Sequence, residues 1–460
     1  MIPNIIIIPP NIKSKLLYSS PGIKTPFRDN VKIIFADVTA SGRPSPIIEE
    51  YINTHILPYY SNTHSNAYCG IMMKNLIMDT KDYIRKTFNI DQTKQIIFTG
   101  CGATCAINHL IHCLQLESHK KVNIFITPME HHSNYLPWVE LSQKYKNIFL
   151  HVIPINDNFD IDVNFLEIKL KETSAFTINI ITMTACSNVL GIKIDFENIY
   201  RIIQKYNGDN CCYGKRNLLF IDYACSAPYV EIRADICDAL FISPHKFIGG
   251  ISTPGLLIAN KKLFYNTHPF IPGGGCVKSV CKNKIEYELD IEKRETAGTP
   301  NIIGIIKIKK ILEVKNFFLN TIQQNEYEIT KYVFGQFKKM QEENNNLIII
   351  LPDCHIDNRL PIICIAIKNL HHNLIVALLS DLFGIQTRGG VSCTGLLVEL
   401  LQNKYNINGW CRISFNWIMD QTEIDYVITA VKYILYNYNT YLDLYTYDPD
   451  SNLFAYKSEI

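Results

Sequence analysis

Short apolar runs alternate with longer amphipathic stretches through the first half of the chain. Seven runs have the continuous apolar character of buried strands, at residues 96–99, 122–126, 148–153, 178–183, 218–221, 239–242 and 255–259. Helical periodicity separates several of them, at residues 103–116, 137–144 and 194–206. Strands alternating with helices predict an α/β fold with a large, mainly parallel seven-stranded sheet covered by helices. In such sheets, ligands bind beyond the carboxyl ends of the strands.

The pattern changes in the second half of the chain. A glycine-rich and then charged segment follows Gly273, and we expect it to cross the surface as a loop. A long helix is predicted from about residue 301, followed by strands at 347–351 and 362–367 and helices at 373–382 and 422–436. We therefore divide the chain into an N-terminal arm (1–30), a large domain (31–315) and a smaller α+β C-terminal domain (316–460).

Composition narrows the class of protein. The chain has 460 residues, 47% of them hydrophobic, and its net charge of +2 gives no basic field for nucleic acid. The four isoleucines near the N-terminus fall far short of the roughly 20 apolar residues of a membrane span. With no signal pattern visible, we expect a cytoplasmic protein without a membrane partner. Fifteen scattered cysteines predict reduced thiols. The sequence has no pair of CxxC motifs at the spacing of a zinc site, so we expect no metal site.

Chemistry-bearing residues follow three of the predicted strands. Residues 100–104 form a glycine-rich turn that opens a helix, where free backbone N–H groups favour phosphate. Asp222 ends a buried strand, and Lys246 follows another, with Ser243 and His245 beside it as donors. Each feature alone has an ordinary explanation: a turn, a cap or a loop residue.

Together these features fit pyridoxal 5'-phosphate (PLP). That cofactor needs a lysine for its Schiff base, a carboxylate for its pyridinium nitrogen and a cradle for its phosphate. Lys246 sits among apolar residues, where a free ammonium is costly. Desolvation makes such an amine a better nucleophile, which explains its apolar setting.

Eight motifs, in order, resemble those of class V aminotransferase-fold enzymes, and most closely the cysteine desulfurase and selenocysteine lyase branch. They are FTGCGAT, MEHHSNYLPW, TACSNVLG, FIDYACSAP, SPHKFIGG, ETAGTPN, TRGGVSC and GWCRISFNW. The order covers residues from about 35 to 435. The resemblance implies the PLP-dependent transferase fold (fold type I).

The resemblance also implies roles for the cofactor site. His131 resembles the residue that stacks on the cofactor ring and shuttles protons, and Asn188 resembles the donor to its phenolic oxygen. The phosphate site is expected at Ala103, Thr104, Ser243 and His245. Thr299 resembles the threonine that reaches the phosphate of the neighbouring subunit, which implies a homodimer with a shared active site.

Three residues of the C-terminal part are implied in substrate chemistry. Arg412 matches the arginine that grips the substrate carboxylate, because a guanidinium fork suits that planar anion. Arg388 is expected to assist with the substrate or the loop. Cys393 matches the mobile-loop cysteine, whose thiolate attacks the substrate sulfur and carries it as a persulfide while alanine leaves. Without the motifs, Arg412 reads as a surface strand residue and Cys393 as a structural thiol.

The sequence departs from the desulfurase pattern at three places. Cys225 stands where a glutamine usually contacts the phenolic oxygen, and cysteine is a poor hydrogen-bond donor. Cys105 replaces a usual glutamate, and Val391-Ser392 replace the two histidines that often precede the loop cysteine. Cofactor tuning and the reaction itself can therefore differ from those of housekeeping desulfurases.

Three functions remain open from the sequence. The leading one is a PLP-dependent cysteine desulfurase-like enzyme acting on L-cysteine or an analogue, with a possible sulfur-acceptor protein. The second keeps PLP but is an aminotransferase, a selenocysteine lyase or another β-lyase. The third is a catalytically degraded sulfur-carrier or partner-binding protein. Intact Asp222, Lys246, His131 and Arg412 favour an enzyme.

Overall fold

The computed structural model describes residues 3, 5–174, 176–207, 217–350 and 356–457. The chain forms two compact units. The sheet unit comprises Gly42–Ala185 and Ile194–Phe317, and the terminal unit comprises Met1–Ser41, Cys186–Lys193 and Phe318–Ile460. The sheet unit ends at Phe317, and this position lies close to the domain boundary expected between residues 315 and 316. The division into an arm and two domains remains a prediction, because a compact unit is not the same as an independently folding domain.

The sheet unit is built on seven strands, as the apolar runs predicted. They are β4 (Lys94–Thr99), β5 (Lys121–Ile126), β6 (Ile148–Val152), β7 (Thr177–Thr184), β8 (Asn217–Asp222), β9 (Ala239–Ile242) and β10 (Gly255–Asn260). Their order is β4-β10-β9-β8-β7-β5-β6. Strand β10 is antiparallel to both of its neighbours, and the other pairs are parallel. The predicted α/β class and mainly parallel seven-stranded sheet are confirmed.

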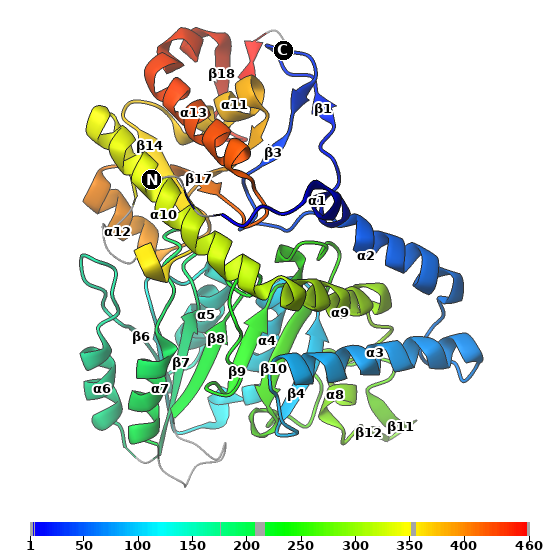
Figure 1. Ribbon diagram of the computed structural model, residues 1–460. Coiled ribbons are helices and arrows are strands. Elements are labelled where there is room, and N and C mark those ends of the chain that lie inside the picture. Colours follow the sequence, from blue (N-terminus) through cyan, green and yellow to red (C-terminus); the bar gives the residue numbers. More distant parts are fainter. Residues whose placement is uncertain (1–2, 4, 175, 208–216, 351–355, 458–460) are drawn as a thin grey trace. The chain divides into compact units, whose positions relative to one another are not determined.

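Helices cover both faces of this sheet (Figure 1). The helices of the sheet unit are α2 (Pro46–Tyr51), α3 (Tyr68–Thr87), α4 (Gly102–Leu114), α5 (Leu136–Lys144), α6 (Val163–Lys171), α7 (Phe196–Lys205), α8 (Ile291–Arg294) and α9 (Ile302–Phe317). Apolar residues of α3, α6, α7 and α9 share one core with the strands. Helix α4 packs on β4, β9 and β10, and α5 packs on β6. Because both faces are buried, the strands read as uninterrupted apolar runs.

The segment after Gly273 is not the surface loop expected from its glycines and charges. It forms an antiparallel hairpin of β11 (Val277–Cys281) and β12 (Lys284–Tyr287). The turn between them spans two residues, Lys282 and Asn283, which is a common hairpin length. Charged and apolar residues alternate along β12, and this two-residue period is the strand signal that the charge count obscured.

The terminal unit has an antiparallel four-stranded sheet in the order β13-β14-β17-β16. The strands are β13 (Leu347–Ile349), β14 (Ile362–Ile367), β16 (Arg388–Gly390) and β17 (Trp410–Ser414), and the main helices are α10 (Leu319–Glu343), α11 (His372–Phe383), α12 (Leu396–Tyr405) and α13 (Gln421–Asn437). The predicted long helix is in fact two, α9 and α10, interrupted at Phe318. Residue 351 of the predicted strand 347–351 lies outside the described residues.

The N-terminal segment belongs to the same unit. Strand β3 (Ile34–Phe35) pairs in parallel with β15 (Ile385–Gln386), and Asp37 bridges to Ser414 at the end of β17. Small elements complete the unit: α1 (Pro10–Leu16), β1 (Gly22–Ile23), β2 (Val31–Lys32), β18 (Tyr445–Asp448) and β19 (Leu453–Tyr456). One apolar core joins Ile34 and Ala36 to the C-terminal helices and strands.

Two further properties concern the described residues as a whole. None of their helices has the length and apolar character that crossing a membrane requires. Their cysteines are free thiols, both the buried and the exposed ones.

Candidate active site

The sheet unit places an acid and an amine at the ends of adjacent parallel strands. Asp222 is the last residue of β8, and β9 runs into the short 3-10 turn that ends at Lys246. The Asp222 carboxylate accepts the Ala224 N–H at 2.9 Å. Burial raises the pKa of Asp222, while this hydrogen bond and the nearby Lys246 cation act in the opposite direction. Asp222 and Lys246, predicted from sequence, therefore belong to one electrostatic group.

The lysine turn is fastened from behind by residues that the sequence did not single out. The Gly42 N–H donates to the His245 carbonyl at 2.9 Å, and the Gly249 N–H donates to the Arg43 carbonyl at 2.7 Å. A Cβ on Gly42 would lie 1.9 Å from the carbonyl oxygen of Phe247, so only glycine fits there. The signal for this contact was the glycine of the ASGR sequence at residues 40–43.

The first turn of α4 and the lysine turn converge. The Ala103 N–H donates to Ser243 Oγ at 2.9 Å. Gly102 has φ +56°, and a Cβ there would lie 2.7 Å from Ser243 Oγ and 2.9 Å from His245 Cε1. Backbone N–H groups at the start of this helix thus lie beside a hydroxyl and an imidazole. Burial, aided by Lys246, lowers the pKa of His245, so its neutral form can donate to an anion.

His131 is linked to the same cradle through Ser133, which sequence reasoning missed. The Ser133 N–H donates to His131 Nδ1 at 3.1 Å, and this leaves the ring proton on Nε2. The Ser133 hydroxyl also bonds to the hydroxyl of Thr104 at 2.6 Å. His131, Ser133 and Thr104 are therefore joined by a continuous chain of hydrogen bonds.

Glu130 is a second buried acid, also missed from sequence. It is 2% exposed and accepts from Thr127 Oγ1 at 2.7 Å and from Asn134 Nδ2 at 2.6 Å. Burial raises the pKa of Glu130 to about 8, against its three hydrogen bonds, and the nearby Asp222 charge adds to the rise. Near neutral pH the side chain is therefore mainly protonated.

The two remaining predicted cofactor residues of the sheet unit differ in exposure. Cys225 is buried, at 5% exposed, and lies three residues after Asp222. Thr299 is exposed, and its hydroxyl accepts from Asn62 Nδ2 at 2.9 Å. The sequence-predicted roles of both stay predictions.

Arg412 is buried in the terminal unit, so its reading as a surface strand residue is wrong. It is 2% exposed, and its Nη2 lies 2.7 Å from Asp37 Oδ1. Its Nη1 donates to the Asn188 carbonyl at 3.2 Å, while the buried Nε has no hydrogen-bond partner among the described residues. A buried guanidinium that uses only part of its five N–H donors is suited to an incoming carboxylate. Asp37 is a further residue that the sequence did not indicate.

Asn188, Arg388 and Cys393 lie around the same strand pair. Arg388 of β16 stands directly opposite Arg412 of β17. Arg388 Nη2 is 3.7 Å from the sulfur of Cys393. The Asn188 amide, expected to serve the cofactor, donates to the Ser392 carbonyl at 2.8 Å. The terminal unit therefore gathers the predicted substrate residues and the predicted sulfur-accepting thiol.

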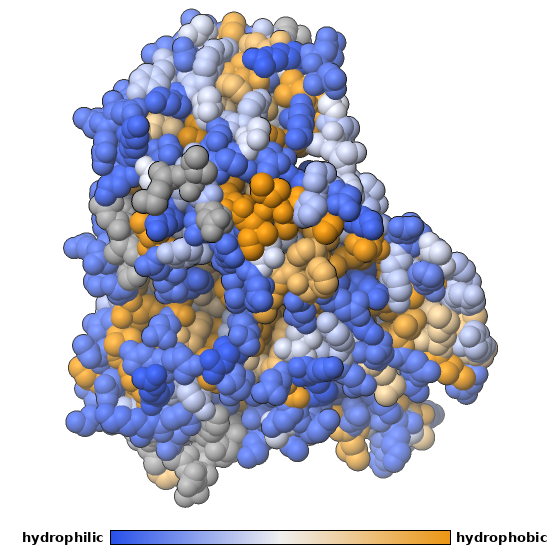
Figure 2. Space-filling view, viewed as in Figure 1, coloured by the Kyte–Doolittle hydropathy of each residue, from blue (hydrophilic) through white to orange (hydrophobic). Residues whose placement is uncertain are grey.

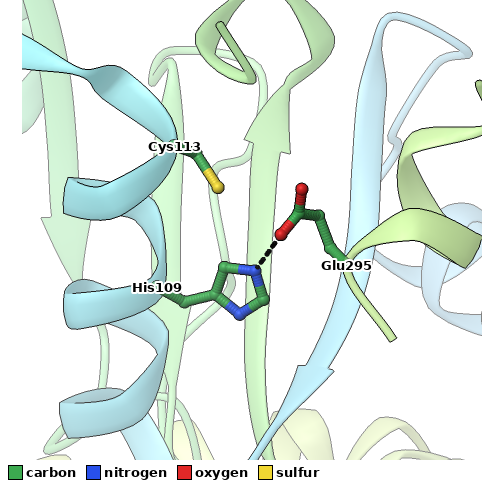
Figure 3. Close-up of side chains that lie close together, drawn as sticks. All are labelled: His109, Cys113 and Glu295. Atoms are coloured by element: carbon green, nitrogen blue, oxygen red, sulfur yellow. Dashed lines mark hydrogen bonds and ion pairs between the residues drawn. The ribbon is translucent and has the colours of Figure 1, made fainter. Parts of the chain in front are cut away.

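One cluster in the sheet unit has the residue types of a metal site. Figure 3 shows His109 and Cys113 on α4 pointing toward Glu295, and all three are buried. The Glu295 carboxylate, however, accepts four hydrogen bonds, from His109 Nε2, the Phe270 N–H, Asn266 Nδ2 and Arg294 Nε. Burial alone would raise the pKa of Glu295, but these bonds lower it to about 2. With its acceptor positions occupied, Glu295 acts as an anchor for the segment that leads to Thr299.

The sequence matches the aminotransferase class-V family over residues 34–427. The chain belongs to this family, as the ordered motifs predicted. Curated relatives include a probable cysteine desulfurase of Borreliella burgdorferi, 29% identical over 421 residues, covering 88% of this chain and 93% of that protein. A cysteine desulfurase of Wigglesworthia glossinidia brevipalpis is also 29% identical, covering 88% and 93%.

Solved structures share the fold. The apo cysteine desulfurase from Thermococcus onnurineus NA1 matches with a TM-score of 0.76 at 22% identity, covering 88% of this chain and 95% of that one. The cysteine desulfurase CsdA from Escherichia coli matches with a TM-score of 0.71 at 21% identity, covering 87% and 94%. The predicted fold type I architecture is thereby confirmed.

Proposed function

We propose that this protein is a PLP-dependent cysteine desulfurase-like enzyme that moves the sulfur of L-cysteine to Cys393 and releases alanine. The observation that carries the proposal is the contact between Cys393 Sγ and Arg388 Nη2, which lie 3.7 Å apart. Arg388 belongs to β16 and stands opposite Arg412 on the neighbouring strand β17. A thiol beside one guanidinium, with a second on the neighbouring strand, would suit a substrate that carries a carboxylate. Relatives at 25–29% identity named as cysteine desulfurases support it.

The sheet unit has the groups that PLP requires. Gly102 leaves room that a Cβ would fill, beside Ser243 and His245, and the start of α4 offers N–H groups for a phosphate. Asp222 is a buried carboxylate suited to a protonated ring nitrogen, and Lys246 would hold the cofactor covalently. When bound, PLP draws electrons away from the substrate α-carbon and so makes the bond to sulfur easier to break.

The chain's own residues prepare that site. Asp222, largely shielded from water, would favour the protonated ring nitrogen by ion pairing. His131 is oriented by Ser133 so that Nε2 carries a proton that it can deliver or hold. His131 would thus serve as the acid–base group close to the ring.

Cys393 carries the sulfur step. Its thiolate would attack the substrate sulfur, forming an S–S bond while the C–S bond breaks. The electron pair of the broken bond, together with a proton, completes the methyl group of alanine. The negative charge of the attacking thiolate is stabilised by Arg388, and the persulfide then awaits an acceptor.

Arg412 would bind the substrate carboxylate. Asp37 and the Asn188 carbonyl fix two of its nitrogens, which orients the guanidinium, and its remaining N–H groups would bind the ligand. Because a guanidinium already paired with Asp37 is partly neutralised, the second cation, Arg388, supplies the remaining attraction.

We also propose that the protein is a homodimer with a shared active site, as Thr299 of the ETAGTPN motif implies. Exposed apolar residues of the sheet unit support a partner surface; they are Ile47, Leu57, Tyr60, Tyr68, Ile71 and Met78. Figure 2 shows apolar residues among polar ones at the right of the view, over α2 and α3. A cytoplasmic location and a separate sulfur-acceptor protein remain predictions from sequence.

The proposal is tested with purified protein, PLP and L-cysteine by measuring alanine and sulfide. We expect alanine from the wild-type protein and a loss of at least a hundredfold in Cys393→Ala, with the cofactor absorbance unchanged. Cys281→Ala is the matched control, because Cys281 is also accessible but lies on β11. Sulfide release that survives Cys393→Ala would favour a β-lyase instead. A new keto acid without alanine would favour an aminotransferase.

A further inference from the structure

The turn that carries Cys393 has an unfavourable backbone. The Thr394 N–H donates to the Val391 carbonyl at 3.4 Å, closing a four-residue turn. Its two central residues, Ser392 and Cys393, have φ of +53° and +55°. Turns with two left-handed central residues normally use asparagine and glycine, because most other side chains crowd the backbone in that conformation. Surrounding contacts must therefore hold this turn in place.

Three hydrogen bonds provide that support. Asn188 Nδ2 donates to the Ser392 carbonyl at 2.8 Å, and Trp410 Nε1 donates to the Ser392 hydroxyl at 3.1 Å. The Thr394 hydroxyl donates to the Val391 carbonyl at 3.0 Å. Ser392, only 5% exposed, is thus bound through both its backbone and its side chain.

Trp410 is placed to do this by the sheet. It is fully buried on β17, and its cross-strand partner is Gly390. A buried indole N–H needs an acceptor, and the Ser392 hydroxyl is that acceptor. Trp410 and Arg412 are two residues apart on one strand, so their side chains share a face.

We propose that Trp410 and Ser392 are positioning residues that hold the Cys393 thiol beside Arg388. One face of β17 then sets both the carboxylate-binding guanidinium and, through the indole, the thiol that receives sulfur. The role of Cys393 as acceptor rests on the proposed function, but the positioning itself does not.

The test is the alkylation rate of Cys393 by iodoacetamide, followed by peptide mass spectrometry on the PLP-loaded protein without substrate. A guanidinium beside the thiol stabilises the reacting thiolate, so Arg388→Gln should slow alkylation about fivefold. Trp410→Phe should slow it to a similar extent. In the double variant, Arg388→Gln should change the alkylation rate little further, because Trp410→Phe has already moved the Cys393 thiol away from the guanidinium.

Ser392→Ala tests whether the effect of Trp410→Phe comes from the lost hydrogen bond or from a folding defect. It removes the same hydrogen bond while leaving the indole in the core, and it should reproduce the effect of Trp410→Phe. Alkylation of Cys281, exposed on β11, should not change in any variant. The proposal is overturned if Arg388→Gln slows Cys393 equally in the wild-type and Ser392→Ala backgrounds. If the effect of Arg388→Gln disappears in the Ser392→Ala background but the wild-type protein forms no alanine from L-cysteine, the positioning holds and only the proposed function fails.

Discussion

Arg388 and Arg412 are cross-strand partners on β16 and β17, so two guanidinium groups emerge from directly opposite positions. Like charges opposite each other destabilise a sheet unless an anion intervenes. Asp37 meets one side of Arg412, at 2.7 Å, and Arg388 is exposed beside Cys393. We therefore propose that the pair receives a second anion, and an amino acid carboxylate is the anion that the proposed reaction supplies.

Replacing Arg412 by lysine should weaken substrate binding. Lysine keeps the charge but loses the planar fork, and it cannot satisfy Asp37 and a carboxylate in the same geometry. We expect the KM for L-cysteine to rise by about tenfold or more, equivalent to about 1.4 kcal/mol or more, with the cofactor spectrum unchanged. Arg201→Lys, on the exposed side of α7, is the control. An unchanged KM in Arg412→Lys would remove this arginine from the site.

Replacing Ser243 by alanine should loosen the cofactor. The change deletes the acceptor of the Ala103 N–H and one donor at the proposed phosphate cradle. The affinity for PLP, measured by the absorbance change when PLP is titrated into the apoprotein, should fall about tenfold. Ser142→Ala removes a comparable local hydroxyl bond on α5 and should leave the affinity as it is. Equal affinities for both variants would place the phosphate elsewhere.

Lys315 should make the free energy of unfolding increase as pH rises above about 7. It is 6% exposed at the end of α9 and donates to the Val230 carbonyl at 2.5 Å. Burial lowers the pKa of Lys315 from 10.5 to about 7. Between these values the unfolded chain binds more protons than the folded one, so this residue's contribution to stability rises with pH.

Urea unfolding at pH 7 and pH 9 measures this effect. The stability difference between wild-type protein and Lys315→Met should shift with pH in favour of the wild type as pH rises. Lys310→Met, on the same helix but paired with Glu313, is the control and should show no such shift. The same pH slope in Lys315→Met and wild type would contradict the assignment.

Glu130 should act in the opposite direction. Its pKa is raised by burial from 4.5 to about 8, so between those values the folded state binds more protons than the unfolded state. Its contribution to stability is therefore complete below about pH 4.5 and is lost as pH rises toward 8. Glu130→Gln, which imitates the neutral acid, should flatten that part of the stability profile. Glu140→Gln, on the exposed face of α5, should retain the slope, and retention by Glu130→Gln would refute the prediction.

The sheet and its strand-end residues could be predicted because their signals are local. Strands buried on both faces read as continuous apolar runs, and Asp222 and Lys246 follow directly from two of them. The hairpin β11–β12 was hidden because charged side chains on an exposed ribbon imitate a loop. The break at Phe318 was also missed, since no glycine or proline marks it in the sequence.

The residues that support the site were harder to predict because their partners are distant in sequence. Asp37 and Arg412 are 375 positions apart, and no spacing rule links them. Gly42 and Ser133 contact site residues through backbone geometry that a side-chain motif does not express. Asn188 was predicted as a site residue, but its bond to the Ser392 carbonyl depends on the conformation of a turn.

The most direct test of the account is the mass of the peptide containing Cys393 after a brief reaction of the PLP-loaded protein with L-cysteine, with other thiols blocked by alkylation. We predict that this peptide gains one sulfur atom, in step with alanine formation, and that Lys246→Ala gains none. Alanine formed while the Cys393 peptide keeps its original mass would contradict the central claim.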